Sequence, residues 1–413
     1  MQQQNIKNIG NQASMNYKII FLLFAGHLMT DISQGIVPAL LPYFISEYHL
    51  SYSAAGFLIL ALTVSSSIVQ PIFGFLADRT SFPWFVAIGP LFAGLGIAVA
   101  GLFHQYYLIV AGIFLCGLGV AAFHPEGARL AGIAAGQKKA SGMSIFSVGG
   151  NAGFALGPLI VAGLILIFGL KGIAFYLVPA LVMSVILFKF VGNFSRITAL
   201  ENERNQNNTS GHTYLENDQL SDHWVPFILL TLALICRSIL LQGFNTFLPS
   251  YWIEVFHASK EEASTVLAVL LGMGVVGNLV GGKLADRFGN QKTVFTAVLL
   301  FIPQLVLFNY LRNSLFATFL LMTMGLTIYI TFSPTIVMGQ QFLPRRAGFA
   351  SGVTIGLAVS IGGFAAPILG KLADLAGVEA VFYLSVIFPV LIALFIFFIP
   401  RTLHRSAINS DNI

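Results

Sequence analysis

The chain has 413 residues, of which 56% are hydrophobic and only 9% are charged, whereas an ordinary soluble domain carries about 25% charged residues. This composition excludes a water-soluble globular protein and predicts that most of the chain lies in or next to a lipid bilayer. The formal net charge of +5 comes from 21 Lys and Arg residues against 16 Asp and Glu residues. The basic residues are scattered singly between apolar segments, so the sequence predicts no nucleic-acid partner.

Twelve apolar segments follow one another along the chain, and each is long enough to cross a hydrocarbon core of about 30 Å as a helix. Helices are expected because a lone span must satisfy its backbone hydrogen bonds internally, and the alternating pattern of a membrane barrel is absent. The predicted fold class is therefore an all-α membrane protein with twelve transmembrane helices. The predicted spans are residues 19–45, 54–77, 82–103, 107–133, 140–168, 172–192, 225–251, 262–284, 293–311, 315–343, 347–370 and 379–399.

Polar stretches divide these spans into two groups of six. We predict an N-terminal tail at 1–18, a six-helix bundle at 19–192, a flexible linker at 193–224, a second six-helix bundle at 225–399 and a C-terminal tail at 400–413. Sixteen of the 21 Lys and Arg residues lie on one side of the membrane if both termini face the cytoplasm. The positive-inside rule favours that orientation, and we expect a multi-pass protein of the inner (plasma) membrane.

An internal repeat relates the two groups of spans. The sequence Gly-Phe-Leu-Ala-Asp-Arg at 74–79 follows the second span, and Gly-Lys-Leu-Ala-Asp-Arg at 282–287 follows the eighth, 208 residues later. Further matches at nearly the same offset join Pro125 to Pro334, Pro158 to Pro367, and Ala-Ser-Gly at 140–142 to Ala-Ser-Gly at 350–352. The pattern indicates two six-helix halves that arose by parallel duplication.

Twelve helices arranged as six plus six, with Gly-x-Leu-Ala-Asp-Arg in both loops, resemble the major facilitator superfamily over essentially the whole chain. Within that superfamily, His27-x-x-x-Asp31, the tract Phe-His-Pro-Glu-Gly at 123–127 and the glycine-rich fifth span resemble the fosmidomycin resistance proteins, which are drug exporters. The resemblance implies a transporter with a small-molecule substrate and protons as its partners, working in the lipid bilayer as a monomer.

The repeated loop motif is interpreted as a cytoplasmic gate. Its glycines permit close helix approach, and its aspartates can accept hydrogen bonds from a helix N-terminus or pair with arginine. Such contacts would lock one conformation and break as the halves rock. The alternative is that the basic residues only fix the topology and keep the loop soluble. The predicted gating residues are Gly74, Asp78, Arg79, Gly282, Asp286, Arg287 and Gly289.

The fifth span carries Gly149, Gly153 and Gly157, one glycine in every four residues. This spacing predicts a helix face without side chains, against which another helix packs closely in lipid. Together with Pro158, the last two glycines also resemble the fifth-helix motif of superfamily antiporters, which implies export. A static helix contact is the alternative interpretation.

Ionisable residues inside the apolar spans mark the candidate proton pathway, because a charge at mid-bilayer costs about 2.5–3.5 kcal/mol. His27 and Asp31 are four residues apart and therefore share a helix face, where they can share a proton. We predict that proton coupling involves Asp31, Glu126, His27 and His124. For Glu126 the alternative is a structural ion pair with Arg129, three residues further along the same helix.

Arg237, near the middle of the seventh span, is the candidate substrate-binding cation of the second half. It is predicted either to bind an anionic substrate or to serve as counter-ion to Asp31 or Glu126, with a permanent interdomain ion pair as the alternative. Gln242 and Asn245 follow on the same helix and are predicted to bind substrate too. Contacts of these two side chains with a neighbouring helix are the alternative.

The sequence contains no phosphate-binding Gly-x-x-x-x-Gly-Lys loop and no HExxH metal motif, so we expect neither a cofactor nor a metal. No extramembrane segment is large enough for a catalytic domain, and we expect no enzyme activity. Energy would then come from an ion gradient. The sequence favours a proton-coupled exporter of small molecules, with proton-linked import of a small organic anion as the first alternative. A non-transporting membrane sensor or an intramembrane enzyme is the second.

Overall fold

The computed structural model describes residues 15–70, 72–73, 82–136, 138–208, 221–346, 349–350, 353–354 and 358–400. Across these ranges the chain is built from helices, and no strand occurs in them. Ten of the described helices are long and apolar enough to cross a membrane, and a shorter apolar helix covers Tyr52–Ile68. The predicted all-α membrane fold is therefore confirmed.

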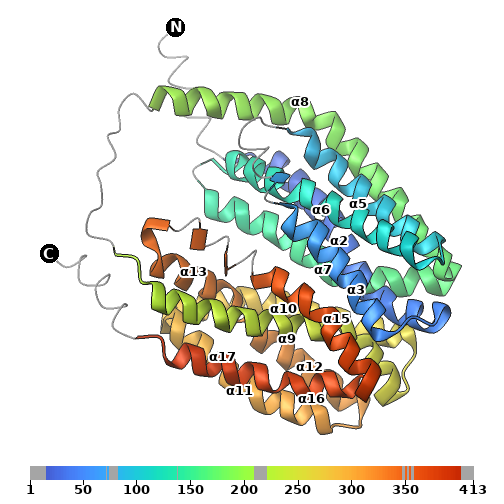
Figure 1. The fold of residues 1–413 in the computed structure, drawn as a ribbon. Coiled ribbons are helices and arrows are strands. Elements are labelled where there is room, and N and C mark those ends of the chain that lie inside the picture. The colour runs from blue at the N-terminus through green and yellow to red at the C-terminus, as the bar shows by residue number, and fades with distance from the viewer. Residues whose placement is uncertain are drawn as a thin grey trace. The chain divides into compact units, whose positions relative to one another are not determined.

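One compact unit comprises Met1–Glu216 together with Ala258–Ala268. Within it, α2 packs against α7 and α6, and α5 packs against α6 and α8. Their apolar faces enclose a core that includes Leu23, Phe123, Phe146 and Phe194. The elements, shown in Figure 1, are α2 (Tyr17–Tyr48), α3 (Tyr52–Thr63), the π-helix η1 (Val64–Ile68), α5 (Trp84–Leu102), α6 (Tyr106–Ala134), α7 (Lys139–Phe168), the 3₁₀-helix η2 (Leu170–Tyr176) and α8 (Leu177–Asn208).

The second compact unit comprises Asn217–His257 and Val269–Ile413. Here α9 packs against α15 and α17, and α11 packs against α12, α13 and α17. A core that includes Leu230, Val298, Met338 and Ile396 lies between these helices. The elements are α9 (Trp224–Phe256), α10 (Lys260–Phe288, from Val269 onward), α11 (Asn290–Tyr310), α12 (Ser314–Tyr329), α13 (Phe332–Phe342), the 3₁₀-helix η3 (Pro344–Arg346), α15 (Ala358–Ala376), α16 (Glu379–Ser385) and α17 (Ile387–Phe397).

The duplication is visible where the first helix of each unit ends. His49 after α2 and His257 after α9 both have a φ of 54°, in the left-handed region that non-glycine residues rarely adopt. Two residues later, Ser51 and Ser259 each accept a hydrogen bond at 3.1 Å from the backbone N–H three residues further on. A serine in this position caps the N-terminus of the next helix. The same turn therefore recurs 208 residues along the chain.

The sixth span, predicted to end at residue 192, continues as α8 to Asn208 (Figure 1). Residues 193–208 of the predicted flexible linker are therefore helical. Phe194 and Thr198 are buried one turn apart, with exposed fractions of 0% and 3%. Because these two side chains lie on one helix face, the buried stripe of the sixth helix runs beyond the predicted end of the span at residue 192.

The tenth predicted span, 315–343, contains two helices, α12 and α13, with a break at Ile330 and Thr331. Thr331 donates its hydroxyl to the carbonyl of Ile328 at 2.6 Å. Pro334 lacks the N–H that would bond to the carbonyl of Ile330, which favours an interruption at this point. The eleventh predicted span, 347–370, falls partly outside the described residues. From Ala358 it is the helix α15, which ends at Ala376 rather than at 370.

Candidate functional site

The glycine face of α7 packs directly against the backbone of α2. A Cβ atom at Gly149 would lie 2.6 Å from the carbonyl oxygen of Phe24, and Cβ atoms at Gly153 and Gly157 would collide with the α2 backbone further along. Pro158 follows within the same helix. The close approach of the two helices therefore depends on the absence of side chains at these glycines.

Three ionisable side chains meet in the first unit. His27 and Asp31 lie one turn apart on α2, and His124 comes from α6. The Nε2 atom of His27 is 3.2 Å from Asp31 Oδ2 and 3.1 Å from His124 Nε2, which in turn is 3.3 Å from Asp31 Oδ1. His27 and Asp31 are buried, whereas the His124 side chain keeps 21% of its surface exposed. We call these three residues the His-Asp-His cluster.

The Nδ1 atoms of both imidazole rings in the His-Asp-His cluster form hydrogen bonds with backbone carbonyls. His27 Nδ1 lies 2.8 Å from the carbonyl oxygen of Phe146, and His124 Nδ1 lies 2.8 Å from that of Val120. A carbonyl oxygen only accepts hydrogen bonds, so each Nδ1 must carry a proton and donate it. In the neutral form of each ring, Nε2 then presents a lone pair. Two lone pairs and a carboxylate thus converge, an arrangement that requires a cation shared among them.

Two further residues complete this environment, and neither follows from the sequence pattern alone. Gln34 donates from its side-chain nitrogen to Asp31 Oδ1 at 3.0 Å. Gly150 on α7 faces the cluster, because a Cβ atom there would lie 2.6 Å from Asp31 Oδ2 and would collide with the His27 ring. The pair Gly149-Gly150 is the only sequence signal for this position, and its spacing alone does not separate a packing glycine from one that leaves space for a site.

Glu126 forms an ion pair with Arg129, three residues further along α6. Its carboxylate has no exposed surface and accepts two hydrogen bonds from Arg129, one of them from Nε to Oε2 at 3.1 Å. Arg129 also donates to the hydroxyl of Thr198 on α8 at 3.2 Å. The geometry is that of a bidentate ion pair tied to a neighbouring helix, which is the alternative interpretation given above.

Arg237 is buried in α9, with 6% of its surface exposed. Its guanidinium lies over the ring of Phe332 at 5.2 Å from the ring centroid. Nε and Nη1 have no hydrogen-bond partner among the residues that the structure describes. Buried polar groups are normally satisfied, so this cation has the unfilled hydrogen-bonding capacity of an anion-binding group.

Arg237 and His27 have similar neighbours in the two units. Arg237 follows His27 by 210 residues, and Phe332 follows Phe123 by 209 residues. The ring centroids of His27 and Phe123 are 5.8 Å apart, so each unit places a basic side chain of its first helix beside the phenylalanine of its fourth span. The basic side chain is a titratable imidazole in the first unit and a permanent cation in the second.

The other two predicted substrate-binding residues also lie on α9. Gln242 donates to the hydroxyl of Thr246 on its own helix at 3.1 Å. The side-chain oxygen of Asn245 is buried and has no hydrogen-bond partner in the described part of the chain. Asn245 is therefore the one of the two that retains a buried acceptor for a further interaction.

Of the predicted gating residues, Gly74, Asp78 and Arg79 lie outside the described residues. The second copy of the motif ends α10, where Asp286 and Arg287 are exposed. Gly289 separates α10 from α11 and has a φ of 90°, a backbone conformation that favours glycine. The turn between α10 and α11 therefore accounts for a glycine at position 289.

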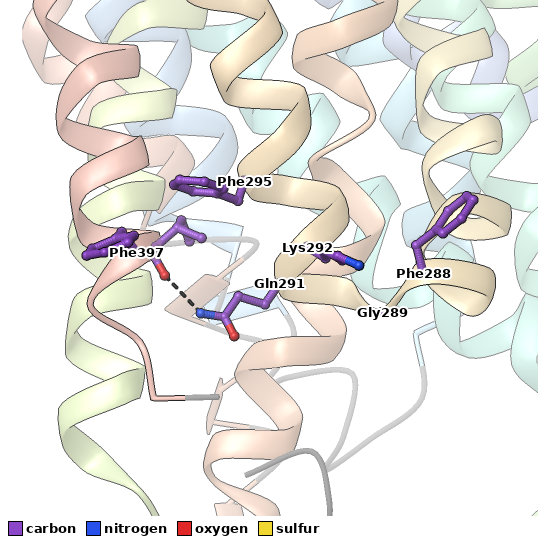
Figure 2. Close-up of a pocket in the computed structure, with 7 residues that line it drawn as sticks. Phe288, Gly289, Gln291, Lys292, Phe295 and Phe397 are labelled. Atoms are coloured by element: carbon purple, nitrogen blue, oxygen red, sulfur yellow. Dashed lines mark hydrogen bonds between the residues drawn. The ribbon is translucent and has the colours of Figure 1, made fainter. Parts of the chain in front are cut away.

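A cavity of about 340 Å³ lies beside this turn in the second unit. Figure 2 shows Gln291 at its centre, with Phe295 and Phe397 to one side and Phe288 to the other. Gln291 donates to the carbonyl oxygens of Ile396 and Ile399 at 3.0 and 2.8 Å, which joins the start of α11 to the end of the chain's last described helix. Among the predicted site residues, only Gly289 lines this cavity.

Comparison with known proteins agrees with this architecture. Residues 23–367 match the family profile of the Major Facilitator Superfamily. The protein named "Uncharacterized MFS-type transporter YfnC" of Bacillus subtilis (strain 168) is 30% identical over 387 residues, which cover 93% of each chain. The fosmidomycin resistance protein of Escherichia coli (strain K12) is 27% identical over 395 residues, 96% of each chain.

Among solved structures, a bacterial homolog of the human lysosomal transporter Spinster, in an inward-facing and occupied conformation, has a TM-score of 0.77. The match covers 94% of this chain and 97% of that chain at 14% sequence identity, so it concerns the fold alone. With the family profile matching most of the sequence, the duplicated helices and repeated loop are accounted for: this chain belongs to the major facilitator superfamily of transporters.

Proposed function

We propose that the protein is a proton-coupled secondary transporter that exports small molecules from the cell by alternating access. The observation that supports this most strongly is the His-Asp-His cluster, in which two imidazole nitrogens and the Asp31 carboxylate lie 3.1–3.3 Å apart and need a shared cation. Protons are the cation that a membrane gradient supplies, and the imidazole is the side chain that titrates near neutral pH. His124, the most exposed of the three, is the point at which a proton enters.

Charge balance links the proton to the conformational change. With both rings neutral and Asp31 ionised the cluster carries one negative charge, and a single bound proton makes it neutral. Enclosing a neutral cluster in a low-dielectric interior costs far less than enclosing a charged one. Proton binding therefore favours the state in which the cluster is closed off. A proton crossing the membrane supplies about 2.3 kcal/mol per 100 mV for the cycle.

The substrate is proposed to carry an anionic group that Arg237 binds. A guanidinium offers paired N–H donors that match a carboxylate or a phosphonate. Buried Nε and Nη1 atoms without partners in the described residues support this role, as does the resistance activity in the name of the E. coli relative, since fosmidomycin is a phosphonate. Asn245, whose buried side-chain oxygen has no partner among the described residues, is proposed to contribute a further polar contact.

Glu126 is assigned a structural role in this proposal, and the proton is assigned to the His-Asp-His cluster. Its bidentate pair with Arg129 holds α6 to Thr198 of α8. We further infer that the protein resides in the inner membrane as a monomer with both termini in the cytoplasm. The concentration of basic residues on one side supports the orientation, and the two bundles within one chain support the monomer.

Everted membrane vesicles test the proposal. An acid-inside gradient is established by respiration and followed with a pH-sensitive dye, and fosmidomycin is then added. Exchange of substrate for protons dissipates the gradient in vesicles that contain the protein and leaves it unchanged in vesicles that lack it. A gradient that stays constant, while labelled fosmidomycin accumulates with no proton requirement, would overturn the proton-coupled export mechanism.

Import of a small organic anion together with a proton is the second candidate, and Arg237 is the observation that favours it. The same vesicles distinguish the two directions. In a proton-linked importer, the labelled anion and protons move the same way, so an imposed gradient drives the anion out of acid-inside vesicles. In an exporter, the acid-inside gradient drives the anion into them.

Replacing Arg237 by Gln tests the anion-binding role. The substitution removes the charge but retains hydrogen-bonding groups, and hydrogen bonds to charged groups contribute about 1.5–3 kcal/mol. The KM for fosmidomycin transport in vesicles is therefore expected to rise about tenfold or more. Arg312→Gln, which alters an arginine outside the helices, is the matched control and should leave KM unchanged. An unaltered KM in Arg237→Gln would contradict the assignment.

Gly150→Ala is expected to abolish proton coupling without unfolding the protein. The added methyl group would displace the Asp31 carboxylate and the His27 ring, whose side chains can rotate away. Gly163→Ala on the same helix is the control, because a Cβ atom there has no atom within 4 Å. Gly163→Ala should unfold at or above the wild-type temperature, since Ala favours helices over Gly by about 0.5–1 kcal/mol. Gly150→Ala should unfold at a lower temperature because it displaces buried side chains, but above the temperature of the assay. Equal gradient dissipation by the two would show that Gly150 does not serve the cluster.

A further inference from the structure

The three converging atoms of the His-Asp-His cluster have the spacing of metal ligands. Zinc binds His nitrogen at about 2.0–2.1 Å and carboxylate oxygen at about 2.0–2.2 Å in a tetrahedron, which puts neighbouring ligand atoms about 3.3 Å apart. In the cluster the two Nε2 atoms are 3.1 Å apart, and they lie 3.2 Å and 3.3 Å from the two different oxygens of the Asp31 carboxylate. All three ligand atoms lie within 4.8 Å of one another, and no other set of three such residues does so in the described chain.

The direction of the lone pairs agrees with this spacing. Both Nδ1 atoms donate to backbone carbonyls, so both Nε2 atoms are available as ligands. A hydrogen bond from the outer ring nitrogen to a carbonyl is the usual support of a metal-binding histidine, since it fixes the tautomer and the ring orientation. One proton bridges only two of the three atoms at a time. A metal ion accepts the lone pairs of all three at once.

A fourth ligand would reach the cluster from its partly exposed side. At Gly150 the α7 helix packs closely against the cluster, since a Cβ atom there would collide with His27 Nε2 and lie 2.6 Å from Asp31 Oδ2. His124 provides the partly exposed side of the cluster. Three protein ligands with an open fourth position for water are typical of zinc sites that exchange ligands rather than of closed structural sites.

We propose that His27, Asp31 and His124 form a binding site for one divalent transition metal ion of the Zn²⁺ and Co²⁺ class. Two imidazoles and one carboxylate select such ions over Mg²⁺ and Ca²⁺, which prefer oxygen ligands. The HExxH spacing used to look for a metal in the sequence does not reveal this site, because its third ligand comes from another helix. An ion bound here occupies the position that the proton takes during transport, and therefore competes with proton coupling.

Metal binding by the purified, detergent-solubilised chain tests the proposal without any transport assay. Calorimetric titration with Zn²⁺ is expected to give one site per chain. His27→Gln and His124→Gln each remove a ligand and should weaken binding by more than about 100-fold, because changes to residues that only support the ligands already cost about 10- to 100-fold. His104→Gln changes an exposed histidine and is the matched control, which should bind as the wild type does.

Co²⁺ provides a second measurement that needs no variant. Binding to the wild-type chain is expected to produce the strong visible absorption of a four-coordinate site, and excess Zn²⁺ should remove it. Mg²⁺ should not. Absence of saturable Zn²⁺ binding, binding that His124→Gln leaves unchanged, or a weak six-coordinate Co²⁺ spectrum would each overturn the proposal. Because the binding assay involves neither a gradient nor a substrate, its outcome is separate from that of the vesicle experiment.

Discussion

Asp31→Asn is expected to eliminate proton-coupled transport while the protein still folds and inserts. The side chains have nearly the same shape, and Asn can still accept the hydrogen bond from Gln34, which is 3.0 Å from Asp31 Oδ1. The amide cannot ionise, however, so the cluster loses the negative charge that makes binding of one proton favourable. Vesicles containing the variant should therefore show no dissipation of the acid-inside gradient when fosmidomycin is added.

A matched substitution separates this effect from a general loss of charge. Asp374→Asn alters an exposed carboxylate on α15 in the same way and should leave the gradient response at the wild-type level. Cells that produce the two variants at equal levels should then differ in resistance to fosmidomycin, which only cells with Asp374→Asn should retain. Full exchange activity in Asp31→Asn would contradict the assignment of the proton to the His-Asp-His cluster.

The sequence predicts one half of the His-Asp-His cluster well, for a geometric reason. Residues four apart on a helix share a face, so the proximity of His27 and Asp31 follows from the helix itself. His124 lies 97 residues after His27 and meets it only because α6 packs against α2. The cost of a charge in lipid identifies His124 as a candidate but does not say which partner it meets.

The sequence also leaves open which glycines pack against the backbone of another helix and which face ionisable side chains. Gly149 and Gly150 are neighbours on α7 and point about 100° apart around the helix. One of them meets the α2 backbone and the other faces the ionisable side chains. Periodicity identifies the packing face at Gly149, Gly153 and Gly157, but the function of Gly150 depends on the rotamers of another helix.

The two units differ in the basic side chain that lies beside the phenylalanine of their fourth span. It is His27 in the first unit and Arg237 in the second. A titratable group suits a transported proton, and a permanent cation suits an anionic substrate, because only the first changes charge during the cycle.

Replacing Arg129, the ion-pair partner of Glu126, is expected to lower the stability of the protein. Arg129→Met removes two guanidinium hydrogen bonds from a carboxylate with no exposed surface. Breaking a buried ion pair at one partner typically costs about 3–5 kcal/mol, because the remaining charge is still desolvated. The variant should therefore show a clearly lowered unfolding temperature in detergent, measured at a fixed scan rate.

The double variant Glu126→Gln/Arg129→Met is expected to recover most of that stability, since it no longer buries an ionised carboxylate. If Glu126 is structural, this double variant also retains proton-coupled export in vesicles, despite lacking an ionisable group at position 126. If Glu126 carries the transported proton, the double variant is stable but inactive, as Asp31→Asn is expected to be. Stability and transport measured on the same preparation thus show whether Glu126 joins two helices as an ion pair or carries a second proton. Only retained export is compatible with a single proton site at the His-Asp-His cluster.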